Sequence, residues 1–586
     1  MTRLVDAITR LRENPRQEEA FETTGHCAVL APPGSGKTML LTTRVAYDLA
    51  SRQIPPPQGA ACITMTNEAA GELRRRLYRL GISRHPSLFI GTVHAFALAA
   101  IVAPFAGIAG FPEVAESRLA SEQEKDDAFN RAFVEVLGAG ADPQFIRTTM
   151  NRTRRLADYS GSADVGGPEI ATLAKRYEEL LLEDKTFDFN DLMRYAVEMV
   201  QGNEWLRRIL ISVYPHLYVD EYQDLPPTLD TLVKSLAFDQ AVNATLFAVG
   251  DPDQAINGFM GTKPELLDEL AEMSGVNHVT LDTNYRCGQG IIDASLLALG
   301  EERSLRGTSE GGEIVVEAEA HGEDGQRQLA VELVERALSE GITHEEVTVL
   351  TYSGIELKEV VDSLRRAGIP VFARLDTDYG ATPVTLAIEA LALYAATDPK
   401  PLDQLSELLD EWQAVTPDFL EHVDIGRLVT VLNSQQTESL ASDFVASLTE
   451  LGLESLDNDP GSSHDGRELE RMKTALQVGE ALEGLTVGEL GERAKAHGRV
   501  MAATTHGIKG LQFDVVVLCD CEEGRMPHWA SINSGDPMKI AEDQRKFYVS
   551  LTRARHRVHL VSSSWRISKR GNRYPIDRSR FVKPLE

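Results

Sequence analysis

The stretch Ala-Pro-Pro-Gly-Ser-Gly-Lys-Thr at residues 31–38 follows a short apolar run at 27–30 and precedes a helix-patterned segment at 39–51. A strand, a glycine-rich loop and a helix in this order form a cradle for phosphate, because the loop N–H groups and the positive end of the helix face the anion. Lys37 can reach the terminal phosphates, and the Thr38 hydroxyl can hold Mg²⁺. The pattern predicts binding and hydrolysis of a nucleoside triphosphate. Because Ala31 replaces the first glycine of the strict pattern, a glycine turn beside a surface lysine stays open as the alternative.

Length and composition are those of a globular protein with several domains. A chain of 586 residues is too long for one hydrophobic core and predicts about three to five domains. Apolar residues make up 42% of the chain and charged residues 25%, which is typical of soluble proteins. The sequence has no apolar run long enough to cross a bilayer and no apolar signal core near its start, so we expect a cytoplasmic protein without a membrane partner.

The cysteines and the charges narrow the possible ligands. Five cysteines, mostly within apolar runs, are typical of buried free thiols, and the spacing of Cys519 and Cys521 disfavours a zinc site. The net charge of −30 disfavours nucleic acid at first sight. The charge is segregated, however: residues 545–583 hold twelve Lys or Arg and one acidic residue, whereas 401–495 hold twenty Asp or Glu and six Lys or Arg. The basic stretch is either an anion-facing surface or a solvated face.

Two α/β patterns run along the chain, each interrupted by a helical segment. In the first pattern, β-type runs alternate with helical ones at 27–30, 61–65, 88–92, 216–219 and 245–249. In the second, such runs occur at 313–317, 347–351, 371–373, 499–504, 515–519 and 558–561. This alternation predicts two parallel sheets covered by helices. The segments at 99–186 and 396–496 lack it and are expected to be mainly helical insertions.

Two adjacent carboxylates follow the β-type run at 216–219. At a strand end beside a phosphate loop, Asp220 could bind Mg²⁺, and Glu221 could orient and deprotonate the attacking water. Adjacent acids are also common in solvated loops, so this pair alone leaves that alternative open.

Nine blocks in register resemble the UvrD/Rep/PcrA branch of superfamily 1 DNA helicases. They are APPGSGKT at 31–38, ITMTNEAAGELRRRL at 63–77, GTVHAFAL at 91–98, FDFNDLM at 187–193, VDEYQDL at 219–225, VGDPDQAINGF at 249–259, LDTNYR at 281–286, TTHGIKGLQFDVV at 504–516 and EDQRKFYVSLTRAR at 542–555. The blocks span almost the whole chain. A small-molecule kinase is disfavoured, because the motifs after residue 200 have no place in one.

The resemblance implies a fold and an activity. The expected fold is α/β, with two RecA-like P-loop domains in tandem, one from residues 1–98 and 187–282 and the other from 283–395 and 497–586. The helical insertions are then 99–186 and an acidic, reduced one at 396–496. The implied activity is ATP- and Mg²⁺-dependent translocation, 3′ to 5′, on single-stranded or tailed DNA.

The resemblance also implies roles for individual residues. The residues implied to bind ATP are Gln17, Pro33, Gly34, Ser35, Gly36, Lys37, Thr38, Arg44, Tyr285 and Gln512, with Thr38 and Asp220 holding the metal. The residues implied to act in catalysis are Glu221, Gln254 and the arginine fingers Arg286 and Arg553. The residues implied to contact DNA are Thr64, Thr66, Asn67, His94, Phe96, Phe259, Thr505 and His506.

The sequence departs from the family pattern at several positions. Met65 and Asn257 stand where the family usually has aromatic residues, and Met260 stands where an arginine usually follows Phe259. Because base stacking on aromatic rings contributes about 1–3 kcal/mol per base, we expect a weaker grip on single strands. Gln512 replaces a glutamate thought to meet the ribose, which puts sugar preference in doubt.

Two alternatives to an independent helicase remain. The acidic insertion should repel duplex DNA and could dock a protein partner, as in the UvrD-like subunit of Gabija-type defence or other nuclease assemblies. The 26 residues after Leu560 leave no room for a nuclease domain of the RecB type, so cutting would need another polypeptide. The other alternative is a nucleotide-switched sensor of DNA ends without processive motion.

Overall fold

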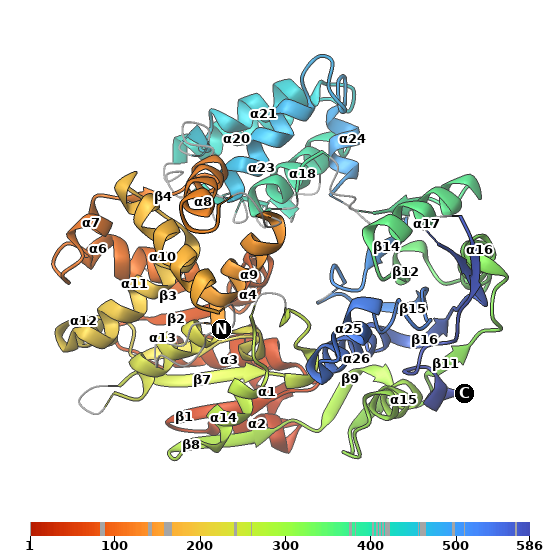
Figure 1. Ribbon diagram of the computed structural model, residues 1–586, viewed down its shortest axis with the longest axis horizontal. Helices are drawn as coiled ribbons and strands as arrows, with labels where there is room; N and C mark the ends of the chain where they lie inside the picture. The colour runs from red at the N-terminus through yellow and green to blue at the C-terminus, as the bar shows by residue number, and fades with distance from the viewer. Residues whose placement is uncertain are drawn as a thin grey trace.

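Two α/β lobes and two groups of helices make up the chain in the computed structural model (Figure 1). One helical group, in orange, lies beside the first lobe, and the other, in cyan, lies above both lobes in this view. The structure describes residues 2–82, 88–138, 143–156, 167–239, 243–258, 261–373, 378–380, 382–400, 404–405, 408–409, 412, 415–416, 422–454, 456, 464–494, 498–508, 510–568 and 571–586.

The first lobe is built on a six-stranded sheet in which every neighbouring pair of strands is parallel. Its strands, in spatial order, are β3 (Leu88–Thr92), β2 (Ala60–Thr64), β6 (His216–Val219), β7 (Thr245–Gly250), β1 (His26–Leu30) and β8 (Val276–Thr280). The central strands are short and almost entirely apolar, as expected of parallel strands that are covered on both faces.

Helices cover both faces of this sheet and enclose two apolar cores. One core contains α1 (Thr2–Arg12), α2 (Pro15–Glu22), α3 (Lys37–Ala50) and α4 (Asn67–Arg79). The other contains α5 (Val93–Phe96), the π-helix η1 (Ala97–Val102), α7 (Pro112–Ala115), α11 (Phe189–Gly202), α12 (Glu204–Val213), α13 (Pro227–Ala237) and α14 (Glu265–Glu272). Short pieces complete the lobe: α6 (Ala103–Phe105), η2 (Tyr222–Asp224) and η3 (Pro252–Gln254).

The first helical group has a core of its own, which runs from Ala120 to Leu181. Its helices are α8 (Glu122–Val136), α9 (Pro143–Leu156) and α10 (Gly167–Glu183), and a two-residue ladder joins β4 (Arg118–Leu119) to β5 (Thr186–Phe187). The core of the first lobe, in contrast, takes in Ile101 and Val114. The separately packed helices therefore begin about twenty residues later than position 99, because residues such as Ile101, Val102 and Val114 pack in the core of the first lobe.

The second lobe repeats the plan with a six-stranded parallel sheet. Its order is β11 (Glu313–Val316), β16 (Ala554–Leu560), β15 (Phe513–Leu518), β12 (Val347–Thr351), β14 (Val500–Thr504) and β13 (Val371–Phe372). One face is covered by α16 (Gly322–Ser339) and α17 (Gly354–Arg366), the other by α15 (Gln289–Leu299) and α26 (Pro537–Leu551). Outside the sheet lie β9 (Thr283–Gly288), β10 (Arg306–Ser309), η5 (His344–Glu346), α25 (Trp529–Ser534), the hairpin β17 (Trp565–Ile567) with β18 (Arg573–Pro575), and η6 (Lys583–Leu585).

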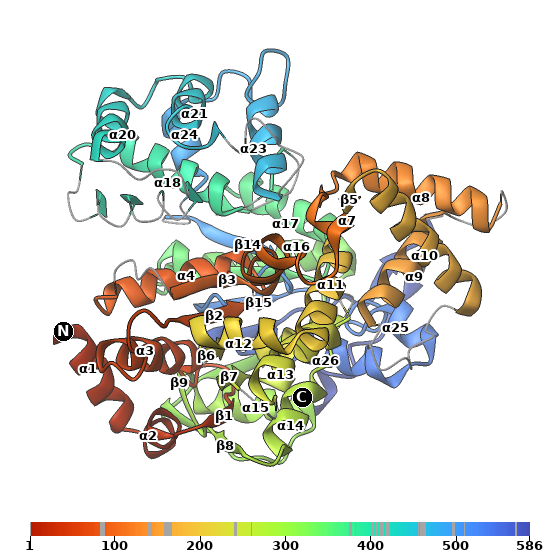
Figure 2. The same ribbon diagram turned by 90° about the vertical axis from the view of Figure 1, so that its left-hand side faces the viewer.

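The second helical group is set off from both sheets, as Figure 2 shows. Its named helices are α18 (Pro383–Ala396), α20 (His422–Ser434), α21 (Ala441–Thr449), α23 (His464–Ala475) and α24 (Val487–Glu492). They share one apolar core that runs from Tyr379 to Leu490. Helix α18 belongs to this core, so the separately packed unit begins before residue 396.

The basic stretch at 545–583 is largely neutralised within the molecule. Arg555 pairs with Asp514, Arg557 with Glu313 and Glu340, and Arg580 with Glu523. Lys569 and Arg570 lie outside the described residues. Much of this stretch is therefore an ion-paired surface of the second lobe. Separately, none of the helices that the structure describes has the length and apolar character needed to span a bilayer.

Candidate functional site

The candidate site lies at one edge of the first sheet. Strands β6, β7 and β1 are parallel neighbours, so their carboxyl ends meet at the same edge. The loop 31–38 follows β1, Asp220 and Glu221 follow β6, and the turn that carries Gln254 follows β7. Three motifs far apart in sequence are therefore brought together by strand order.

The phosphate loop depends on two glycines with left-handed backbone, Gly34 (φ 70°) and Gly36 (φ 82°). A Cβ on Gly34 would lie 2.5 Å from Asn284 Oδ1 and 2.8 Å from Arg286 Cβ, so only glycine fits there. The loop is also bonded to the chain that enters the second lobe: Asn284 Nδ2 donates to the Pro33 carbonyl at 2.8 Å, and the Tyr285 N–H donates to the Gly34 carbonyl at 2.8 Å.

Lys37 and the two carboxylates form a compact charged group. The Lys37 ammonium donates to Glu221 Oε2 at 2.7 Å, and the Gln223 amide donates to the same oxygen at 2.6 Å. The Thr38 hydroxyl lies 3.4 Å from Asp220 Oδ2. Burial and the neighbouring Glu221 charge raise the pKa of Asp220 to about 6, so a cation beside it would favour the ionised carboxylate.

These oxygen donors fit Mg²⁺. This ion prefers hard oxygen ligands and commonly takes one or two protein groups, with phosphates and water completing its shell. Thr38 and Asp220 supply a hydroxyl and a buried carboxylate of that kind. Among the described residues there is no cluster of three or more His, Cys, Asp or Glu side chains that could hold a metal ion.

Gln254 joins this edge to the second lobe. Its amide nitrogen donates to Asp251 Oδ2 at 2.7 Å, and its carbonyl oxygen accepts from Arg553 Nη2 at 3.3 Å. The backbone N–H of Asp251 in turn donates to Gln223 Oε1 at 2.9 Å. A continuous polar path therefore runs from Lys37 through Gln223 and Gln254 to Arg553.

Two arginines of the second lobe face this edge with only neutral acceptors. Arg286 donates to Gln512 Oε1 at 3.2 Å and to the Thr552 carbonyl at 3.0 Å. Arg553 is 1% exposed and, besides Gln254, donates to backbone carbonyls on its own lobe. Burial and the nearby Arg286 charge lower the pKa of Arg553 to about 9. In the part of the chain that the structure describes, neither guanidinium has a carboxylate at ion-pair distance.

The residues implied to read the base lie on the other side of the loop. Gln17 is buried, and its amide donates to the Ser35 carbonyl at 2.7 Å. The Tyr285 ring is 47% exposed, and its hydroxyl accepts from Asn14 Nδ2 at 2.9 Å. Gln17 and Tyr285 both contact the backbone of the phosphate loop, so an amide and an exposed ring beside it could bind and stack an adenine.

Arg44 is engaged elsewhere. Its guanidinium donates to Asp48 Oδ2 at 2.7 Å and to the Phe21 and Thr23 carbonyls at 2.7 and 2.8 Å. These bonds tie α3 to the end of α2, behind the phosphate loop. The structure thus gives Arg44 a structural role, and its nucleotide contact stays a prediction.

The contact between Gln512 and Arg286 yields a test that separates two roles. Gln512→Ala removes the side-chain acceptor of the Arg286 Nε, so we expect kcat for ATP hydrolysis to fall by about three- to tenfold with KM nearly unchanged. Steady-state kinetics at varied ATP concentration measure both constants. A change confined to KM would instead assign Gln512 to the nucleotide sugar.

The residues implied to contact DNA lie at the carboxyl ends of strands in both lobes. Thr64 ends β2, and Thr505 follows β14; both are buried, and their hydroxyls are without a partner among the described residues. Thr66 is exposed and caps α4 by accepting from the Ala69 N–H. Burial lowers the pKa of His94 and of His506 to about 4, so both imidazoles are neutral at physiological pH. The Asn67 side chain and Phe259 lie outside the described residues.

The structure corrects the expectation for Phe96. Its ring is 1% exposed and packs in the core of the first lobe against Phe89 and Tyr214, so it has no free face for a base. An exposed aromatic ring that the sequence reasoning passed over, Phe189, meets the His94 ring edge to face at 5.7 Å. Its signal in the sequence was its place as the first residue of α11, after the capping residue Asp188.

Comparison with known proteins agrees with this arrangement. The UvrD/REP helicase N-terminal domain matches residues 13–274, and the UvrD-like helicase C-terminal domain matches residues 444–564. The chain is 25% identical to ATP-dependent DNA helicase UvrD1 of Mycobacterium tuberculosis over 651 aligned residues, covering 94% of this chain and 83% of that protein. It is 24% identical to ATP-dependent DNA helicase PcrA of Staphylococcus epidermidis over 643 residues, covering 98% and 86%. With both family matches in chain order over more than half of its length, this chain belongs to the UvrD/Rep helicase family.

Proposed function

We propose that the chain is an ATP-dependent DNA helicase or translocase that moves 3′ to 5′ on single strands by closing and opening its two lobes. The observation that carries this proposal is the pair Arg286 and Arg553, held by neutral acceptors opposite the phosphate loop. Burying a cation without a counter-ion costs several kcal/mol, and a bound polyanion offsets that cost. A nucleoside triphosphate between the lobes supplies such an anion.

The residues of the first lobe have complementary tasks in this proposal. Lys37 leaves Glu221 for the terminal phosphates, and the loop N–H groups hold the remaining phosphate oxygens. Thr38 and Asp220 would hold Mg²⁺, which when bound would neutralise charge on the phosphates. Glu221, released from Lys37, orients the attacking water and takes its proton. The Lys37–Glu221 bond of 2.7 Å supports this exchange because it keeps both groups within reach of one small volume.

In this proposal Arg286 and Arg553 couple ATP hydrolysis to movement of the two lobes. In the transition state, negative charge on the transferred phosphoryl group draws Arg286 and Arg553 inward, and product release weakens that attraction. Direct bonds already join the lobes: Arg545 Nε donates to the Ala255 carbonyl at 2.7 Å, and Arg553 donates to Gln254. Two lobes that touch through a few polar bonds, and not through one continuous apolar core, are suited to repeated opening.

The strand track crosses the carboxyl ends of both sheets. We assign phosphate contacts to Thr66, Asn67 and His506, and base contacts to His94, Phe189 and Phe259. Thr64 and Thr505 are 1% and 0% exposed, so they join the phosphate contacts only if movement of the lobes uncovers their hydroxyls. The neutral imidazoles favour hydrogen bonding or stacking over ion pairing with phosphate. The side chains at 65 and 257 are not aromatic, so the exposed ring of Phe189 supplies a larger share of the base stacking in this track.

Phe189→Ala tests the track. Loss of one base stack should weaken the Kd for a single-stranded oligonucleotide by about 5- to 100-fold, because such stacks contribute about 1–3 kcal/mol. Fluorescence anisotropy with a labelled oligonucleotide measures the Kd. Ile209→Ala, at a comparably exposed apolar position on α12, is the matched control and should leave the Kd unchanged. Equal Kd values for the parent and Phe189→Ala would remove Phe189 from the track.

Strand displacement on matched 3′-tailed and 5′-tailed duplexes tests the function as a whole. We expect ATP hydrolysis to rise with single-stranded DNA, and displacement to occur on the 3′-tailed duplex only. Stimulated hydrolysis without displacement on either substrate would favour the end-sensing switch. Displacement from the 5′-tailed duplex alone would contradict the proposed polarity.

A second function, as the motor subunit of a nuclease or defence assembly, is favoured by the second helical group. This unit has its own apolar core and stands apart from both sheets, and residues 401–495, which make up most of it, hold twenty acidic against six basic residues. An acidic unit of this kind suits a basic protein surface better than a duplex. Co-purification of a nuclease with the full chain, lost on removal of the acidic unit, would support it.

A further inference from the structure

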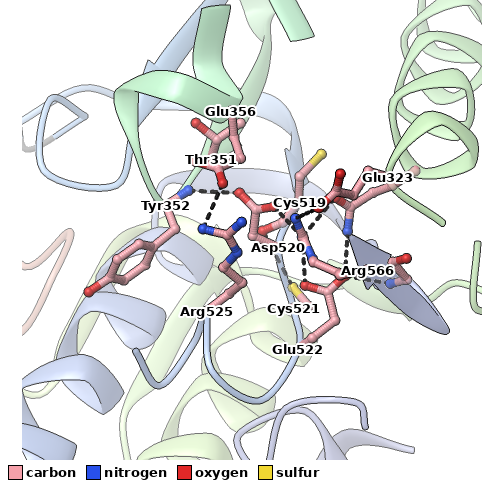
Figure 3. Close-up of polar contacts among 12 residues, drawn as sticks. Glu323, Thr351, Tyr352, Glu356, Cys519, Asp520, Cys521, Glu522, Arg525 and Arg566 are labelled. Atoms are coloured by element: carbon pink, nitrogen blue, oxygen red, sulfur yellow. Dashed lines mark hydrogen bonds and ion pairs between the residues drawn. The ribbon is translucent and has the colours of Figure 1, made fainter. Parts of the chain in front are cut away.

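A buried charge network joins the C-terminal hairpin to the end of the second sheet (Figure 3). Arg566, on β17, donates to Asp520 Oδ1 at 2.7 Å and to Glu522 Oε2 at 3.0 Å, and all three side chains are 2% exposed or less. Asp520 and Glu522 belong to the loop that follows β15. Glu522 also accepts from Gln326 Nε2 on α16 at 2.7 Å. The network therefore ties three elements of the lobe together, none of which touches the phosphate loop.

Asp520 holds an unfavourable backbone conformation within this network. Its φ of 61° lies in the left-handed region, which is unfavourable for an L-residue, although aspartate tolerates it better than most residues. The network also carries more carboxylates than cations. Burial accordingly raises the pKa of Glu522 to about 7, while Arg566 opposes that shift. A strained residue and unbalanced buried charges persist only where the surrounding contacts outweigh their cost.

The second oxygen of Asp520 extends the path to β12. The Tyr352 N–H donates to Asp520 Oδ2 at 3.0 Å, just beyond the end of β12. The Tyr352 ring stacks on His528 with centroids 5.3 Å apart and planes 5° from parallel. Both residues are close to Asp543 of α26: the His528 N–H donates to its carboxylate at 2.9 Å, and burial together with the Asp543 charge raises the pKa of the Tyr352 hydroxyl. Asp520 thus holds the Tyr352 backbone. The Tyr352 ring packs on His528, whose N–H is bonded to Asp543 of α26.

Helix α26 carries the contacts that reach the other lobe. Arg545 in this helix donates to the Ala255 carbonyl of the first lobe. The helix ends at Leu551, two residues before Arg553, whose Nε still bonds back to the Val549 carbonyl at 3.0 Å. A displacement of α26 therefore moves Arg553 relative to Gln254.

We propose that Asp520 and Arg566 are positioning residues for ATP hydrolysis, which fix the C-terminal hairpin and α26 in one arrangement so that Arg553 meets the triphosphate. The inference rests on the proposed function for its kinetic consequence. Its structural part, the link from Asp520 to α26, stands on the bonds above.

Asp520→Gly is the decisive variant, because glycine adopts a φ of 61° without strain and its lack of a side chain removes both carboxylate acceptors. We expect kcat at saturating single-stranded DNA to fall about fivefold or more, with the KM for ATP within about twofold of the parent. Asp520→Asn tolerates the same backbone but keeps only one of the two oxygen acceptors, so it should restore part of the lost kcat. Hydrogen exchange of the α26 amides should be faster in Asp520→Gly than in the parent.

Glu523→Gln is the matched control. Glu523 adjoins Glu522 and pairs with Arg580 at 2.8 Å, but that pair is exposed, so its loss should change neither kcat nor exchange in α26. Asp520→Gly with parental kcat and parental α26 exchange would overturn the proposal. An equal fall in Asp520→Gly and Asp520→Asn that follows a loss of thermal stability would overturn it too, since that outcome belongs to a merely structural residue.

The two readouts separate this inference from the proposed function. If the parent hydrolyses ATP and Asp520→Gly is unchanged in both readouts, the positioning role fails and the function stands. If the parent shows no hydrolysis while α26 exchange still rises in Asp520→Gly, the function fails and the link to α26 stands.

Discussion

Glu221→Gln is expected to bind ATP and DNA like the parent, while its kcat falls about 10²- to 10⁴-fold. Glutamine keeps the size of the side chain and can still accept a hydrogen bond from Lys37, which lies 2.7 Å from the native Oε2. It cannot accept a proton from the attacking water. The loss should therefore fall on the chemical step, while the contacts that hold the phosphates remain.

Single-turnover hydrolysis and equilibrium ATP binding together measure this effect. Glu204→Gln, an exposed glutamate at the start of α12 that pairs with Arg208, is the control for a generic loss of charge and should match the parent. If Glu221→Gln hydrolysed ATP within a few fold of the parent, Glu221 would not be the base. A large loss of ATP affinity would also contradict its role, because it would place Glu221 among the binding groups.

The strands of both sheets could be predicted from the sequence where burial on two faces makes them continuously apolar. The expected runs at 216–219 and 347–351 coincide with the central strands β6 and β12. Strand β8 (Val276–Thr280) was missed, because it lies at the sheet edge and carries exposed polar residues that break the apolar pattern. The edge strands β3, β11 and β13 lie where β-type runs were expected, so edge position alone does not hide a strand when its apolar run is kept.

The limits of the helical insertions could not be predicted, because helix periodicity does not say against which core a helix packs. The segment at 97–115 and helix α18 are both apolar and helical. The first packs on the sheet of the first lobe, and the second packs in the core of the acidic unit. Only tertiary contacts decide between these assignments.

The residues of the candidate nucleotide site could be predicted from the sequence more fully than those of the strand track. Lys37, Asp220 and Gln254 come from three motifs whose place after parallel strands fixes where they meet. Phe96 and Phe189 show the opposite case, since both are aromatic residues within family motifs. One is buried in the core and the other is exposed beside His94, and a motif does not record which way a ring points.

Arg553→Ala is expected to lower kcat by about 10³-fold or more while changing ATP affinity little, because an arginine finger stabilises charge that develops only in the transition state. Arg553→Lys should recover only a small part of that loss. A lysine keeps the charge but lacks the planar fork with which Arg553 bonds Gln254 through Nη2 and the Val549 carbonyl through Nε.

Arg555→Ala is the neighbouring control for this experiment. Arg555 lies two residues further on, at a half-buried position where it pairs with Asp514 at 2.6 Å on its own lobe, so its removal should leave kcat within a few fold of the parent. An effect of Arg553→Ala on KM alone would make Arg553 a ground-state ligand. A fall in kcat shared by Arg553→Ala and Gln254→Ala, without further loss in the double variant, would instead follow from the bond of 3.3 Å between them, since each side chain then acts through the other. In that case the bond between Gln254 and Arg553 would couple ATP hydrolysis to the opening of the two lobes.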